Sequence, residues 1–273
     1  MKYRPWVFIV AVLLFSWLVQ IVLFTGMLPA NLLILYMFAP ALTAFIFFVL
    51  FKTPWREQLD LFIRRIDLWS IVFAFFYPFF WLSLVLLVAV LTGLGQFNAS
   101  FLSKALAWPF ISSFLMLVVF AFPTMWGEEY GWRGYLLPGL VERYGKLNAT
   151  LILGLVWGCW HIPSYYILYS QAGLGQPVLL TITGILTVAV GAFPYTYLFY
   201  RTRNIIPCVL LHAAYDLASG HIFFGTPAIP GFTDGTPGLV MMPWPTAMML
   251  LIVTGAVLAG GFVFLFGKEA KGT

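Results

Sequence analysis

Four side chains in this sequence have the types and placement to perform acid–base chemistry together. They are the carboxyls of Glu128 and Asp216 and the imidazoles of His161 and His212. All four lie within or beside long apolar runs. If those runs cross a membrane, a charged group at the bilayer centre costs about 2.5 to 3.5 kcal/mol even on the lenient insertion scale. Function or mutual pairing, rather than ordinary packing, must therefore account for them.

The first carboxyl belongs to a pair of adjacent glutamates. On a helix, Glu129 and Arg133 stand at i and i+4 with the acid N-terminal, which is the better orientation for an ion pair. Glu128 points about 100° away, and its own i+4 neighbour is Trp132. We therefore expect Glu129 to be paired locally and Glu128 to need a partner from another helix. The alternative is a structural Glu-Glu-Arg cluster at the end of a membrane helix.

The second carboxyl, Asp216, shares one helix face with His212, again at i and i+4. A single His on a membrane helix is often held by packing and one hydrogen bond, but this pair has a second His and a Glu to face. Glu128, His161 and Asp216 each lie 13 to 15 residues from a cationic residue at one end of their helix, about 20 to 22 Å at 1.5 Å per residue. This shared depth predicts that they meet, unless Pro138-Gly139 breaks the first helix.

Three chemistries could use this set of side chains. Two histidines and a carboxylate could hold zinc, but the compact H-E-x-x-H arrangement is absent and each ligand would come from a different helix. A Cys159 nucleophile would need His161 to take its proton, but residues at i and i+2 lie about 200° apart on a helix, so the two side chains do not meet. Glu128 with His161 can instead polarise a water molecule while the other pair stabilises an oxyanion, without a metal or a cofactor.

The elements that position these groups must be membrane helices. The chain has 273 residues, of which 62% are hydrophobic and 8% are charged, whereas soluble domains carry about one-quarter charged residues. This composition excludes secreted, cytosolic and nucleic-acid-binding proteins. Cys159 and Cys208 stand in apolar runs without C-x-x-C spacing, so we expect neither a disulfide nor a zinc ribbon.

Uncharged segments predict about eight transmembrane helices in one membrane domain over residues 1–273. Breaks at 25–29 and 171–177 divide the two longest apolar runs. The predicted spans fall at about 5–24, 30–51, 68–95, 105–127, 147–170, 177–200, 204–224 and 235–267. The first run is too long for a signal peptide and is interpreted as a retained helix. The predicted fold class is an all-α polytopic membrane protein.

The segments between the predicted spans lie alternately on the two sides of the membrane, and the Lys and Arg residues are concentrated on one side. Thirteen of the 14 Lys and Arg residues, Arg133 among them, fall on one side and Lys104 falls on the other. This asymmetry predicts that both termini are cytoplasmic. Between the second and third spans, Trp55, Leu59 and Phe62 recur at helical spacing among charged residues, which is typical of a helix on the inner membrane surface. A solvated connector is the alternative.

Small residues predict where the helices approach one another. Gly127 and Gly131 frame Glu128 as a small-x-x-x-small face. Gly154 and Gly158 form a second face of this kind, three residues before His161. We expect the two faces to pack on each other.

Three motifs together resemble those of a known family. The strings Glu128-Glu129-x-x-x-Arg133, Trp157-x-x-x-His161 and His212-x-x-x-Asp216 are similar to the motif set of the CAAX protease and bacteriocin-processing family of intramembrane endopeptidases. The match covers order, spacing and placement within residues 105–220. The resemblance implies an eight-helix, metal-independent glutamate protease. In it Glu128 and His161 would activate water, His212 and Asp216 would stabilise the oxyanion, and Glu129, Arg133 and Trp157 would support the site.

Two positions depart from the pattern of the CAAX prenyl proteases. Trp157 stands where Phe is more common, and Asp216 stands where Asn is usual. An amide donates a hydrogen bond to an oxyanion, whereas an ionised carboxylate repels it. Asp216 must therefore be neutral, as burial favours, or it must orient a cationic His212 as the donor. The Asp also weakens the case for prenylated CAAX proteins as substrates.

The predicted function is an intramembrane endopeptidase that hydrolyses a peptide bond near the cytoplasmic membrane interface, with CAAX-type prenyl protein processing as one form of it. Its partners would be the lipid bilayer and a peptide, prenylated protein or other membrane protein, without nucleic acid. The protein would be multi-pass, in the cell membrane if its source is a prokaryote, with its site accessible from the cytoplasmic side. The alternative is a non-catalytic transporter or scaffold, although the sequence lacks the inverted repeat typical of transporters.

Overall fold

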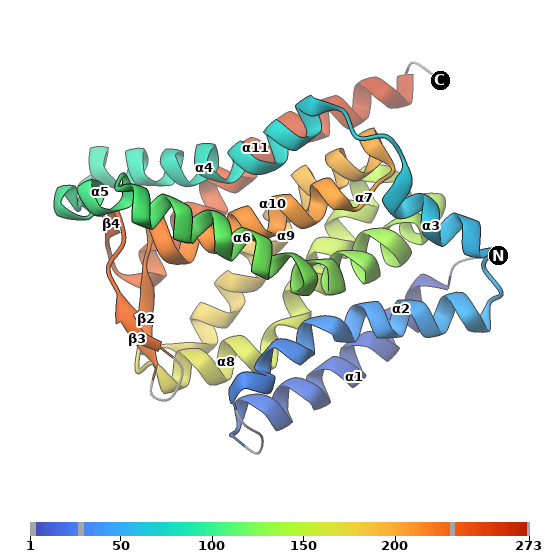
Figure 1. Cartoon of the computed structure of the whole chain (residues 1–273), viewed down its shortest axis with the longest axis horizontal. Coiled ribbons are helices and arrows are strands. Elements are labelled where there is room, and N and C mark those ends of the chain that lie inside the picture. The colour runs from blue at the N-terminus through green and yellow to red at the C-terminus, as the bar shows by residue number, and fades with distance from the viewer. Residues whose placement is uncertain (1–3, 27–29, 230–232, 272–273) are drawn as a thin grey trace.

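The computed structural model describes residues 4–26, 30–229 and 233–271, and it is built almost entirely of helices packed side by side (Figure 1). The long helices are α1 (Pro5–Phe24), α4 (Leu68–Leu91), α6 (Trp108–Glu129), α7 (Leu137–Trp160), α9 (Pro177–Thr202) and α11 (Trp244–Lys271). Shorter helices are α2 (Ala39–Leu50), α3 (Trp55–Ile63), α5 (Ala99–Ala105), α8 (Ile162–Gln171) and α10 (Ile206–Leu217). A 3₁₀ segment, η1 (Ala30–Phe38), precedes α2.

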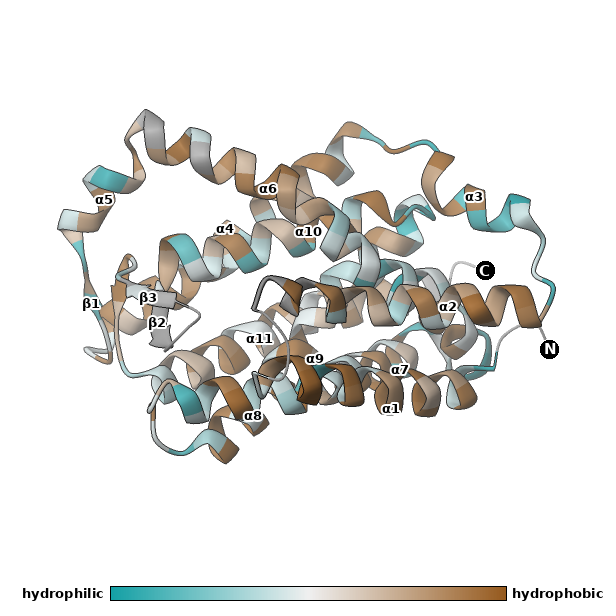
Figure 2. Ribbon diagram, turned by 60° about the horizontal axis from the view of Figure 1, so that its bottom comes forward, coloured by the Kyte–Doolittle hydropathy of each residue, from teal (hydrophilic) through white to brown (hydrophobic). Residues whose placement is uncertain are grey.

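Five helical stretches of the described chain are long and apolar enough to cross a membrane. They are 5–24, 68–91, 110–160, 177–202 and 244–267, with a shorter apolar helix at 35–50. The hydrophobic colouring runs along these helices, while hydrophilic residues gather at α3 and in the connecting segments (Figure 2). The chain is therefore an all-α integral membrane protein. The five stretches do not establish the expected count of eight, and that count stays a prediction.

The stretch 110–160 contains a turn at Gly145, which has φ +71° and ψ 167°. Glycine adopts this left-handed conformation without the steric cost that a Cβ would bring. Before the turn the chain approaches the start of α1, where Trp6 donates a hydrogen bond to Tyr144. After it the chain runs along α1, so that Gln20 near the end of α1 bonds the carbonyl of Trp160. One apolar stretch thus provides two neighbouring helical segments.

The helix that carries Glu128 continues well past the glutamates. The chain stays helical from α6 through a π-helical segment, η2 (Tyr130–Leu136), into α7. Pro138 and Gly139 lie inside that helical run and do not break it. The break that these two residues could have caused between Glu128 and Arg143 is therefore absent.

The two small-residue faces pack on different partners, so the prediction that they pack on each other is wrong. A Cβ built on Gly127 would lie 2.7 Å from the Met37 carbonyl, and one on Gly131 would lie 2.6 Å from Pro40. A Cβ on Gly158 would instead meet the backbone of α9 at Ile185, 2.7 Å away. Small residues do mark close helix approach here, but their spacing does not say which helix approaches.

A helix with exposed side chains, α3, follows the second predicted span, at the position that the sequence predicts. In α3 Trp55 and Ile63 are exposed, whereas Gln58 is buried and accepts a hydrogen bond from Tyr130. The segment after α3 is held by Asn204, whose side chain donates to the carbonyls of Phe62 and Arg64. The placement of this helix on the inner membrane surface stays a prediction.

Both described ends of the chain lie at one end of the bundle, and two short pairs of strands lie at the other (Figure 1). β1 (Gln96–Phe97) pairs with β4 (Val240–Met241), which lies far from it in the sequence, and β2 (Thr226–Ile229) forms a hairpin with β3 (Thr233–Thr236); both pairs are antiparallel. They join the loop before α5 to the end of a second π-helical segment, η3 (Ala218–Phe223), since Leu239 bonds both Asn98 and Ile222. We refer to the end of the bundle with the described chain ends as the terminal end, and to the end with the strand pairs as the hairpin end.

Candidate active site

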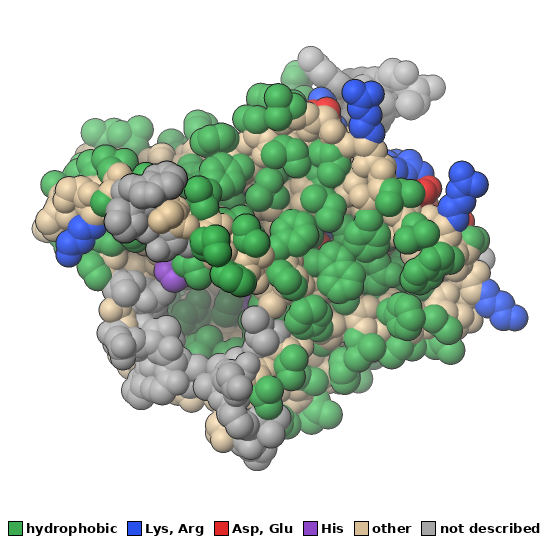
Figure 3. All heavy atoms as spheres, viewed as in Figure 1, with side chains coloured by type: hydrophobic (Ala, Val, Ile, Leu, Met, Phe, Trp, Pro, Cys, Tyr) green, Lys and Arg blue, Asp and Glu red, His purple; other side chains and the backbone are tan. Residues whose placement is uncertain are grey.

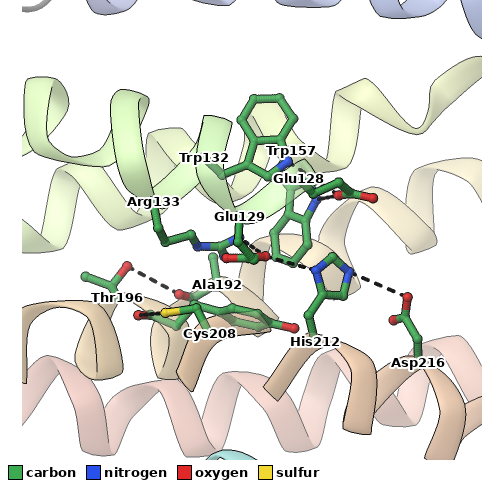
Figure 4. A network of polar contacts seen from close by, with 11 residues as sticks. Glu128, Glu129, Trp132, Arg133, Trp157, Ala192, Thr196, Cys208, His212 and Asp216 are labelled. Carbon is green, nitrogen blue, oxygen red and sulfur yellow. Dashed lines mark hydrogen bonds and ion pairs between the residues drawn. The ribbon is translucent and has the colours of Figure 1, made fainter. Parts of the chain in front are cut away.

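Glu129 is the centre of a buried polar network at the end of α6 (Figure 4). Its Oε1 atom accepts a hydrogen bond from Nη1 of Arg133 at 2.8 Å and lies 2.9 Å from Nδ1 of His212. The side chains of both Glu129 and Arg133 are 0% exposed. The i, i+4 pairing expected from the sequence therefore forms, and it joins α6 and η2 to α10.

Arg133 is held by aromatic rings as well as by Glu129. Its guanidinium carbon lies 4.2 Å from the ring centre of Trp157 on α7 and 4.1 Å from that of Tyr195 on α9. Stacking of this kind stabilises a desolvated guanidinium. Arg133 was counted among the cations that orient the protein in the membrane, but it lies in the interior and does not contribute to that asymmetry at a surface.

Glu128 turns away from this pair and meets two indole groups. Its Oε2 atom accepts a hydrogen bond from Nε1 of Trp157 at 2.8 Å and a longer one from Nε1 of Trp132 at 3.4 Å. Its Oε1 atom is buried and has no hydrogen-bond partner among the described residues. The residue is 1% exposed. The partner from another helix that the sequence required is thus an uncharged donor, which leaves one carboxylate oxygen for a further ligand.

His212 lies between two carboxyl groups. Its Nδ1 faces Glu129, and its Nε2 lies 3.5 Å from Oδ2 of Asp216. His212 is almost fully buried, whereas the Asp216 side chain is 44% exposed. Asp216 is therefore less enclosed by side chains than its place in an apolar run suggests, because this carboxyl faces a cavity.

His161 stands at a break between two helices. It ends α7 and precedes α8, where Pro163 at the second position of α8 removes one backbone donor. Its ring stacks on Tyr165 with ring centres 4.6 Å apart and meets the edge of Trp160 at 4.7 Å. No hydrogen bond joins His161 to Glu128 within the described part of the chain. A bound water would have to bridge them.

A cavity of about 300 Å³ joins the groups from three helices. Its wall includes Trp157, His161, His212 and Asp216, together with aromatic residues such as Tyr165. Glu128 is not part of the wall but is hydrogen-bonded to Trp157, which is. A space-filling view shows a hollow on the face of the molecule nearer the hairpin end (Figure 3).

Two features of the site have no counterpart in the sequence motifs. A π-helical segment directly follows each acidic element: η2 begins after Glu129, and η3 begins two residues after Asp216. Such segments occur often at functional sites because they reorient side chains by one position. Tyr195 and Tyr165, which hold Arg133 and His161, had no signal beyond aromatic character.

The described residues contain no group of three His, Cys, Asp or Glu side chains placed to hold a metal ion. The zinc option therefore has no ligand set in this part of the chain. Metal independence itself stays a prediction.

Fold and site together define an all-α membrane protein with an acid–base network in its interior. Residues 108–218 match the family model described as type II CAAX prenyl endopeptidase, Rce1-like. A CAAX prenyl protease 2 of Methanococcus maripaludis is 27% identical over 107 residues, which cover 38% of this chain and 38% of that relative's length. The segment matched by the family model contains all seven site residues, and the resemblance to the CAAX protease family is confirmed.

Proposed function

We propose that the protein is an intramembrane endopeptidase in which Glu128 activates a water molecule for attack on a peptide bond. The observation that carries this proposal is the split environment of Glu128. One of its oxygens is fixed by Trp157, and the other is buried without a partner among the described residues. An oriented carboxylate with one free oxygen is suited to bind and deprotonate water.

The proposed reaction needs only groups of this chain. Glu128, with His161 across the bound water, takes a proton as the water oxygen bonds to the peptide carbonyl carbon. The resulting oxyanion is stabilised by a hydrogen bond from His212, whose cationic form Glu129 favours. The C–N bond then breaks, and the proton held by Glu128 passes to the leaving amine. Trp157 and the Glu129–Arg133 pair keep the two reactive side chains in position.

A non-catalytic transporter or scaffold is the second candidate. The Glu129–Arg133–His212 network supports it, because such a buried, ion-paired cluster can serve assembly or proton coupling. Glu128 does not, because it has no cationic partner and its Oε1 has no donor among the described residues, an arrangement from which assembly gains nothing. We therefore favour the hydrolase.

The proposal includes the orientation of the protein in the membrane and the side from which the substrate enters. The Lys and Arg asymmetry supports eight spans with both termini in the cytoplasm. The wall of the cavity takes residues from α4, α9 and α10, and also from α8, η3 and the start of α11, which lie toward the hairpin end (Figure 1). These last three elements favour access from the side away from the termini over the cytoplasmic access expected from the sequence. We keep the orientation and propose that the peptide enters from the half of the membrane away from the termini.

The substrate class follows from the wall of the cavity. Aromatic side chains dominate it, which suits an apolar peptide segment or a lipid-modified one. The CAAX prenyl protease named among the relatives supports prenylated proteins, whereas Asp216 and the side of access support other membrane proteins.

Cleavage assays with purified protein test the proposal. The substrates are a prenylated CAAX peptide, its unprenylated form and a library of membrane-protein segments, each with and without a chelator. Cleavage that is lost in Glu128→Gln supports the hydrolase. Absence of cleavage of every substrate, together with substrate flux in vesicles, would support the transporter, and loss of cleavage on chelation with rescue by zinc would overturn the metal-independent mechanism.

A further inference from the structure

The imidazole of His161 is oriented by packing alone within the described residues. Neither of its ring nitrogens has a hydrogen bond to another described residue, although the ring lies in the cavity wall. A histidine that bridges to a catalytic water must nevertheless present one nitrogen in a fixed direction. Whatever fixes the plane of this ring therefore contributes to the reaction.

Tyr165 is the side chain that fixes that plane. It stands four residues after His161, and the two rings are parallel within 4° at a centre-to-centre distance of 4.6 Å. Parallel stacking leaves the edge of the imidazole, where the nitrogens are, open to the cavity. The edge of Trp160 closes a second side at 73°.

Tyr165 is in turn positioned by a glycine on α9. A Cβ built on Gly184 would lie 2.7 Å from Cε2 and 2.8 Å from Cδ2 of the Tyr165 ring. Distances under 3.0 Å require that something shift, and the atoms concerned belong to a rigid ring rather than to a flexible chain end. The absence of a side chain at Gly184 is therefore what lets the Tyr165 ring occupy its place.

We infer that Tyr165, seated against Gly184, is a positioning residue that holds the imidazole of His161 at the catalytic water. The inference rests on the proposed function and extends it to a pair of residues outside the motifs. It assigns the contact between α8 and α9 to catalysis as well as to packing.

Gly184→Ala tests the inference directly. The added methyl displaces the Tyr165 ring and the imidazole stacked on it, and we expect a fall in kcat of up to about 100-fold, the scale that misplacement by 1 Å produces, with a smaller change in KM. The control is Gly260→Ala on α11, a position outside the cavity wall where the added methyl meets nothing within 4 Å, so that kcat should stay near that of the parent.

Substitutions of Tyr165 separate positioning from general stability. Tyr165→Phe keeps the stacked ring and should retain kcat, whereas Tyr165→Leu removes it and should lose activity. In the Tyr165→Leu background, Gly184→Ala should cost nothing further, because the ring it displaces is gone. The His161 proton resonances, shifted by the stacked ring, should move in Gly184→Ala and stay in Tyr165→Phe.

Each outcome decides one claim. An active Gly184→Ala protein with parent-like His161 resonances overturns the positioning role, provided Glu128→Gln is inactive in the same assay. If Glu128→Gln is itself active, the proposed hydrolytic mechanism fails instead. A Gly184→Ala protein that does not fold shifts the test to the Tyr165→Phe and Tyr165→Leu pair, where equal activity contradicts the inference.

Discussion

Glu128 and Glu129 are neighbours in the sequence and have opposite surroundings. Glu129 has a cation and an imidazole on one oxygen, whereas Glu128 has only neutral indole donors. Removing one partner of a buried ion pair costs more than removing an unpaired carboxylate, because it leaves an uncompensated charge. The two residues therefore differ in what their loss does to the protein.

We predict that Glu128→Gln abolishes cleavage and leaves the stability close to that of the parent. The amide oxygen of Gln can still accept the hydrogen bond from Trp157, while the general base, worth about 10² to 10⁴ in rate, is lost. Glu129→Gln should instead destabilise by about 3 to 5 kcal/mol, since Arg133 is left without its carboxylate. Cleavage rates and thermal unfolding in detergent measure both. A stable, inactive Glu129→Gln beside an active Glu128→Gln would reverse the two roles.

A second residue-scale prediction concerns Asp216. Its carboxyl faces the cavity and lies 3.5 Å from Nε2 of His212, and we expect it to act as an anion that orients this imidazole. Asp216→Asn should then lower kcat by more than about tenfold at every pH, as loss of a histidine's carboxylate partner does in other hydrolases. The measurement is a pH–rate profile of both proteins on one peptide. An Asn variant that keeps its activity to higher pH than the parent would establish the neutral-donor role.

Local geometry explains which contacts of the site could be predicted from the sequence. The Glu129–Arg133 and His212–Asp216 pairs follow from i, i+4 spacing on one helix. The hydrogen bond from Trp157 to Glu128 joins residues 29 positions apart and depends on how the helices pack. The exposure of Asp216 depends on an open cavity, which composition and spacing do not describe.

At the scale of elements, the sequence predicts helices better than it predicts their contacts. Apolar runs and their breaks identify the helices. One example is α9, which starts at Pro177, directly after the predicted break at 171–177. The glycine faces show that close approach occurs but give no information on the partner, which is why Gly131 was assigned to the wrong neighbour. The break at His161 had a local signal in Pro163, because a proline restricts the residues before it.

The contact between Gly131 and α2 gives a prediction at this scale. A methyl at position 131 would lie 2.6 Å from Cβ and 2.7 Å from the carbonyl carbon of Pro40. Since neither atom is the end of a flexible chain, Gly131→Ala should destabilise by about 1 to 3 kcal/mol, as overpacking of a core does. Thermal unfolding in detergent measures the loss.

The matched control is Gly260→Ala on α11, where an added Cβ meets nothing within 4 Å. This variant should be at least as stable as the parent, because Ala has the higher helix propensity. Equal melting temperatures for the two alanine variants would show that the approach of α2 to η2 is looser than the structure has it.

At the scale of the whole molecule, the site and most of the cationic residues at the surface lie in different parts of the bundle. On the face drawn in Figure 3, Lys and Arg side chains gather toward the terminal end, with one cation at the opposite end. Buried side chains of η2 and α7, among them Tyr135, Leu136 and Leu140, fill the interior on the terminal side of the glutamates. The cavity therefore lies toward the hairpin end of the bundle. Which side of the membrane the substrate enters from then depends on how the protein is oriented in the membrane.

The last prediction tests that orientation and the route of the substrate together. In a protein whose Cys159 and Cys208 are replaced, single cysteines are introduced at Lys104 near the hairpin end, at Arg56 near the terminal end and at Ser219 in the cavity wall. A membrane-impermeant maleimide is added to intact cells and to lysed cells. Lys and Arg residues concentrate in the cytoplasmic loops of membrane proteins, so the terminal end should face the cytoplasm and the hairpin end the outside. We therefore expect Lys104→Cys to react in intact cells and Arg56→Cys to react only after lysis. Ser219→Cys should react under the same conditions as Lys104→Cys, since both lie toward the hairpin end. If Ser219→Cys instead reacts only after lysis, as Arg56→Cys does, the cavity is accessible from the cytoplasmic side.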